Sequence, residues 1–80
     1  MKQVIDRRVL HKAEVFSGIV RGVHERNGHI YVQVFVPALG VTLPFVRADL
    51  PFGTWLYEAQ RLYPEGKQVT VFKRNGQWFL

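Results

Sequence analysis

The 80-residue chain contains no cysteine, which excludes a disulfide framework and any metal site built on thiolates. A chain without disulfides is typical of a reducing compartment, and we expect a cytoplasmic location. No long apolar run follows Lys2, so residues 1–6 do not predict a signal peptide. The longest apolar stretch, residues 34–46, is interrupted by two prolines, a glycine and a threonine, and is shorter than the ~20 residues of a membrane-spanning helix. We therefore expect no membrane partner.

The chain also lacks the residue groupings that catalysis uses. Its six acidic residues are scattered and form no close pair, and its single serine, Ser17, has no elbow motif around it. His24 and His29 have a spacing that zinc sites use, but they flank a predicted turn without a third ligand, and we expect both to be solvated. No glycine-rich phosphate loop is present. The sequence therefore predicts a protein that is not an enzyme, with no metal, no cofactor and no small-molecule substrate.

Positive charge is in excess, with 11 Lys and Arg against 6 Asp and Glu and a formal net charge of +5. An excess of this size on a small domain fits a polyanionic partner such as nucleic acid. It also fits a surface charged only for solubility, and charge alone leaves both interpretations open.

The first twelve residues differ in character from the rest. Lys2, Arg7, Arg8 and Lys12 are crowded there against one acid, Asp6. We interpret residues 1–12 as a basic N-terminal arm, or as a short strand with ragged ends, preceding one domain formed by residues 13–80.

Alternation of apolar and polar residues predicts the strands. It is clearest in residues 29–36, where four β-branched residues fall on one face. Further strands are predicted at residues 13–23, 41–46, 67–72 and 77–80, and Pro44 should lie at an edge or a bulge because it has no backbone donor. Asn-Gly at 27–28 and at 75–76 predicts two hairpin turns. The predicted core residues are Val20, Ile30, Val32, Val34, Val69 and Val71.

One helix is predicted between the third and fourth strands. Apolar residues recur at helical spacing from Trp55 to Tyr63, after Thr54 as a possible N-cap, and Pro64 and Gly66 end the pattern. Trp55 and Trp78 lie in apolar runs and are predicted to be core residues. The predicted fold is all-β: a small five-stranded antiparallel Greek-key barrel of the OB type with one short helix, and an SH3-like barrel is the competing architecture.

Four sequence motifs, one in each of the first four predicted strands, together resemble the S1 domain, the RNA-binding OB-fold found in ribosomal protein S1. The first-strand pattern is carried by Gly18, Val20, Arg21 and Val23, and the second by Gly28 and residues 30–34, with His29 inserted. Residues 40–43 match the start of the third strand, and residues 63–71 match the aromatic, the glycine and the alternating valines of the fourth. The resemblance covers residues 13–80 and implies an OB-fold that binds single-stranded RNA. Leu43 stands where many S1 domains carry a histidine.

In barrels of this kind the ligand face is the outward side of the second and third strands. Bases stack on aromatic rings there, and cations follow the phosphates. The candidate nucleic-acid-binding residues are Arg21, His29, Tyr31, Gln33, Phe35, Arg47, Lys73 and Arg74. The predicted partner is single-stranded RNA, or DNA, bound by this aromatic and basic face.

Two observations keep an alternative open. The missing third-strand histidine and the apolar helix also fit a protein-interaction or structural barrel, in which Tyr31 and Phe35 are covered by the arm or by the helix.

Overall fold

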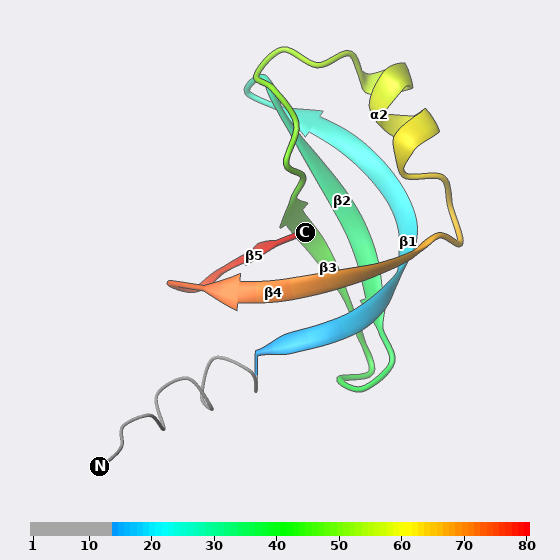
Figure 1. Ribbon diagram of the computed structural model, residues 1–80, viewed down its shortest axis with the longest axis vertical. Coiled ribbons are helices and arrows are strands. Elements are labelled where there is room, and N and C mark those ends of the chain that lie inside the picture. Colours follow the sequence, from blue (N-terminus) through cyan, green and yellow to red (C-terminus); the bar gives the residue numbers. More distant parts are fainter. Residues whose placement is uncertain (1–13) are drawn as a thin grey trace.

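The structure is a computed structural model that describes residues 14–80 (Figure 1). The predicted basic arm, residues 1–12, lies outside the described residues. The five strands in chain order are β1 (Val15–Arg26), β2 (His29–Val36), β3 (Val41–Arg47), β4 (Gln68–Arg74) and β5 (Gln77–Phe79). The helix α2 (Leu56–Leu62) follows β3 and precedes β4.

The five strands form a closed barrel in the order β1-β2-β3-β5-β4, with β4 pairing back onto β1. A mostly β fold with a closed five-stranded barrel and one short helix among the described residues confirms the coarse prediction. The prediction of purely antiparallel pairing is wrong for one pair, because β3 and β5 run parallel, with Val46 opposite Trp78 and Arg47 opposite Phe79. Strand directions cannot alternate all the way around a ring with an odd number of strands, so a closed five-stranded barrel needs at least one parallel pair.

Alternation in β2 places its apolar face in the barrel. Ile30, Val32, Val34 and Val36 are buried, while the residues between them are half-buried or exposed. The inward valines meet equivalent residues from the other strands, and the buried core is Val20, Ile30, Val32, Val34, Val36, Val46, Ala48, Ala59 and Val71. Five of the six predicted core residues are buried, and Val69 is half-buried against them.

The long strand β1 pairs with two neighbouring strands. Its first half pairs with β4 from Val15 to Ile19, and its second half pairs with β2 from Ile19 to Arg26. A register shift between Val20 and Gly22 marks a bulge, a feature that glycine within a strand often accompanies. Figure 1 shows the resulting curvature of β1 around the barrel.

Both predicted Asn-Gly turns form. Asn27 and Gly28 have φ of 53° and 84°, and Asn75 and Gly76 have φ of 51° and 80°. Positive φ at both central residues is the geometry that matches the twist of the flanking strands, and Asn-Gly adopts it readily. The prediction for Pro44 is also confirmed, because the β2–β3 register shifts between the Val32–Val46 and Val34–Leu43 pairs.

The helix α2 is shorter and more exposed than the sequence predicted. Only Ala59 is buried, and Trp55 is 70% exposed, so the prediction that Trp55 is a core residue is wrong. The reason is that Trp55 precedes the helix in an extended conformation (φ −69°, ψ 142°) and does not share the inward face of Ala59. Thr54 does not cap the helix, because its hydroxyl donates to the Pro51 carbonyl at 2.6 Å. Within residues 14–80 no helix has the length and apolar character needed to cross a bilayer.

Candidate functional site

Three aromatic rings from adjacent strands meet on the outside of the barrel. His24 of β1, Tyr31 of β2 and Phe45 of β3 contact one another pairwise, with ring centroids 5.1 to 5.9 Å apart. Phe45 packs edge-to-face against both partners, an arrangement that favours aromatic pairs. Phe45 remains 44% exposed. We call His24, Arg26, Tyr31 and Phe45 the β1–β3 cluster.

A hydrogen bond across β2 fixes the imidazole in this cluster. The Nε2 atom of His24 lies 2.9 Å from the carbonyl oxygen of Pro44. Because a carbonyl only accepts, the hydrogen must be on Nε2 of His24. The carbonyl belongs to the bulged part of β3, where the regular β2–β3 register is interrupted. His24 was predicted to be solvated; the residue is half-buried, and its ring makes this hydrogen bond at the exposed surface, to a bulge that only the folded sheet creates.

Two arginines border the aromatic rings. The guanidinium carbon of Arg26 lies 5.0 Å from the centroid of the Phe45 ring, within cation–π range. The side chain of Arg47 donates to Nδ1 of His29 at 2.9 Å, so His29 too is half-buried and paired rather than solvated. Guanidinium groups in contact with exposed rings can meet a phosphate and a base at neighbouring positions.

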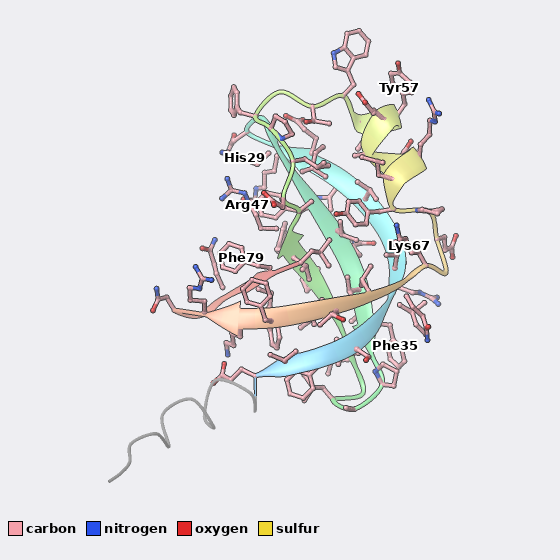
Figure 2. All side chains as sticks on the ribbon, viewed as in Figure 1. His29, Phe35, Arg47, Tyr57, Lys67 and Phe79 are labelled. Atoms are coloured by element: carbon pink, nitrogen blue, oxygen red, sulfur yellow. The ribbon has the colours of Figure 1, made fainter. Side chains whose placement is uncertain are left out.

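A second aromatic and basic group lies on β4 and β5. Phe72 and Phe79 stack with centroids 5.7 Å apart and an interplanar angle of 24°. The guanidinium of Arg74 lies 5.5 Å from the Phe72 ring and 5.9 Å from the Phe79 ring. Phe79 is the register partner of Arg47, so this group adjoins the C-terminal end of β3. Figure 2 shows His29, Arg47 and Phe79 along one side of the molecule.

An open groove of about 440 Å³ adjoins this second group. Arg47 and Asp49 line its β3 side, and Phe72, Arg74 and Phe79 line the opposite side. The negative charge of the Asp49 carboxylate disfavours a phosphate directly beside it, whereas the positive charges of Arg47 and Arg74 favour one.

The predicted site residues are distributed unevenly over this surface. Tyr31 lies in the β1–β3 cluster, with the hydrogen-bonded pair of His29 and Arg47 beside it. Arg74 belongs to the second group, and the ammonium of Lys73 lies 5.7 Å from the Trp78 ring. Trp78 is half-buried and packs against the core.

Three predicted residues lie apart from these aromatic and basic contacts. Phe35 is half-buried at the far end of β2, opposite Ile19 and Thr42 (Figure 2). Gln33 is exposed beside Gly22. Arg21 is exposed at the β1 bulge, and none of the ring contacts within residues 14–80 includes it. Within the described chain, His29 and Tyr31 are therefore the predicted residues of β2 that take part in ring contacts.

Sequence reasoning missed Phe45, Arg26 and His24 as members of the site. A signal existed for Phe45, because inward Leu43 and Val46 are three residues apart, a spacing that requires a bulge at Pro44. In β1 the bulge between Val20 and Gly22 reverses the alternation, so that Val23 packs against the core and His24 and Arg26 face outward.

In the part of the chain that the structure describes, no group of three His, Cys, Asp or Glu side chains could hold a metal ion. Comparisons with models of protein families, with curated proteins and with solved structures found no match.

Proposed function

We propose that this barrel binds single-stranded nucleic acid across the outer face of β1, β2 and β3. The observation that carries the proposal is the β1–β3 cluster, in which three rings meet at the surface with Arg26 over one of them. Every base has a π-face, so exposed aromatic rings give sequence-tolerant stacking, and adjacent cations attract the phosphates. The choice of RNA over DNA rests on the resemblance to the S1 domain.

We further propose that the barrel is of the OB type. The strand order β1-β2-β3-β5-β4, the bulged and strongly curved β1 and the helix between β3 and β4 in the chain support this assignment. In five-stranded barrels of that type the β2–β3 face binds oligonucleotides. Tyr31 and Phe45 come from those two strands and contact each other with ring centroids 5.8 Å apart.

The geometry also favours a single strand over a duplex. In a duplex each base stacks on its neighbours and its faces are not available to side chains. A single strand can turn its bases onto Tyr31 and Phe45 while its phosphates lie near Arg26 and Arg47. The Arg47–His29 hydrogen bond holds this guanidinium in a fixed position, which reduces the conformational entropy lost on binding.

Titration of the protein with a fluorescently labelled single-stranded oligonucleotide, followed by anisotropy at two salt concentrations, tests the proposal. We expect saturable binding that weakens as salt rises, because each neutralised phosphate releases counterions. A duplex of the same sequence serves as the matched control and should bind more weakly. No binding to single-stranded RNA or DNA at low salt would refute the proposal.

A second candidate function is protein binding through α2 and the residues before it. Trp55, Leu56, Tyr57 and Leu62 are exposed there, and Trp55 packs edge-to-face on Tyr57. Exposed apolar residues that gather on one element are typical of interaction sites. If the titration finds no nucleic-acid binding, this surface becomes the preferred candidate.

A further inference from the structure

Phe52, in the connection between β3 and α2, is an exposed ring held in a fixed place. Its side chain is 73% exposed, yet its ring covers Gly28 in the β1–β2 turn. A Cβ atom at Gly28 would overlap the Phe52 ring, and Gly28 has a φ of +84°. Glycine therefore meets two requirements here: the conformation of the turn and the approach of the ring.

The backbone around Phe52 is anchored on both sides. The Gly53 amide donates to the Gly28 carbonyl at 2.9 Å, which ties the connection to the β1–β2 turn. The Thr54 amide donates to the Pro51 carbonyl at 3.1 Å, and the Thr54 hydroxyl donates to the same oxygen. These bonds close a turn over residues 51–54 and present the Phe52 ring to solvent. A ring fixed in this way loses little conformational entropy when a flat ligand stacks on it.

The position of Phe52 continues the line of the proposed site. Its ring packs edge-to-face against His29 at 5.3 Å between centroids. His29 and Tyr31 are two residues apart on the same face of β2, about 7 Å along the strand. This spacing is similar to the separation of consecutive bases in an extended single strand. Arg26 is the register partner of His29, and the guanidinium of Arg47 donates to the His29 ring. Two cations therefore border the path between Tyr31 and Phe52.

We propose that Phe52, together with His29, forms a second base-stacking position that extends the nucleic-acid path from the β1–β3 cluster onto the β3–α2 connection. This inference rests on the proposed function and extends the length of nucleic acid that the barrel contacts. A single nucleotide fills only the β1–β3 cluster, whereas an oligonucleotide also reaches Phe52. The contribution of Phe52 should therefore appear with oligonucleotides and not with a mononucleotide.

The test compares wild-type protein with Phe52→Ala, Phe52→Leu and Phe52→Tyr against thymidine monophosphate and against oligothymidines of about 4 to about 12 nucleotides, which lie within the range of site sizes for single OB-type barrels. Stacking on an aromatic ring predicts a loss of about 5- to 150-fold for the longest oligomer in Phe52→Ala. Phe52→Leu should show a similar loss because it keeps an apolar side chain without a ring, and Phe52→Tyr should bind like wild type. For thymidine monophosphate the four proteins should differ little.

Tyr57→Ala is the matched control, since Tyr57 is an exposed aromatic residue on α2, away from His29 (Figure 2). It should bind all oligomers like wild type. If wild type binds and Phe52→Ala binds the longest oligomer equally well, the second position is refuted while the proposed function stands. Equal losses in Tyr57→Ala and Phe52→Ala would also refute it. If wild type binds no oligomer, the proposed function itself has failed. Thermal melting of each variant checks that the fold is retained.

Discussion

Replacing Gly18 by alanine tests how tightly β1 is packed against β2. Gly18 is buried in the first half of β1, where it pairs with Val69 of β4. A Cβ atom at this position would lie closer than 3.0 Å to Cγ1 of Val34, a separation that real Cβ atoms essentially never show. It would also lie 3.1 Å from the carbonyl oxygen of Phe35. The added methyl group therefore meets a core side chain and a backbone atom at the same time.

The surroundings decide how large the effect is. Val34 is fully buried, so it cannot turn into solvent to make room, and the two strands have to move apart. Overpacking of a well-packed core costs about 1–3 kcal/mol, and contact with backbone favours the upper half of that range. The lower entropy of the unfolded alanine chain offsets about 0.4–1 kcal/mol. We expect Gly18→Ala to lower the free energy of unfolding by about 2 kcal/mol, which corresponds to a fall in Tm of roughly 8–16 °C for a domain of this size.

Urea unfolding followed by circular dichroism measures this change, and Gly22→Ala is the matched control in the same strand. A Cβ atom at Gly22 would lie 3.0 Å from Oε1 of Gln33, the end of an exposed side chain that can rotate away. Gly22→Ala should therefore lie within about 0.5 kcal/mol of wild type. In a Val34→Ala background, Gly18→Ala should cost less than in wild type. Equal midpoints for the Gly18 and Gly22 variants would refute the packing described for β1.

Three further substitutions test the site and the core. Tyr31→Ala should weaken single-strand binding by about 1–3 kcal/mol, measured by anisotropy, with little change in its salt dependence, because it removes a stacking ring and no charge. Arg26→Ala should reduce the slope of log affinity against log salt by roughly 0.7, while Arg61→Ala on α2 leaves it unchanged; equal slopes would exclude a phosphate contact at Arg26. Val32→Ala should cost about 1–3 kcal/mol in urea unfolding through lost burial and a residual cavity, and an unchanged midpoint would mean that the faces of β2 are reversed.

Features set by local sequence were predicted well. The alternation of β2 placed Ile30, Val32 and Val34 in the core, because a strand with one buried face must show a period of two. Both Asn-Gly turns formed where the sequence placed them, because few other residue pairs accept two consecutive positive φ values.

Features that depend on contacts distant in the sequence were not predicted. The His24–Pro44 hydrogen bond joins β1 to β3 across β2, and it exists only once the bulge in β3 is formed. Phe45 joins the candidate site through that same bulge.

The error for Trp55 has a local cause. Helical spacing of apolar residues does not show at which residue the helix begins, and Trp55 lies one residue before it in an extended conformation, so its side chain points in a different direction from that of Ala59.

The most direct test of the central claim is to map the bound surface by NMR. Backbone amide shifts of ¹⁵N-labelled protein would be followed during titration with a single-stranded RNA oligonucleotide. We expect the largest changes at the ends of β1, β2 and β3 that carry His24, Tyr31 and Phe45, with small changes in α2. Changes confined to α2 and the residues before it, or no changes at saturating RNA, would contradict the claim that the outer face of these three strands binds nucleic acid.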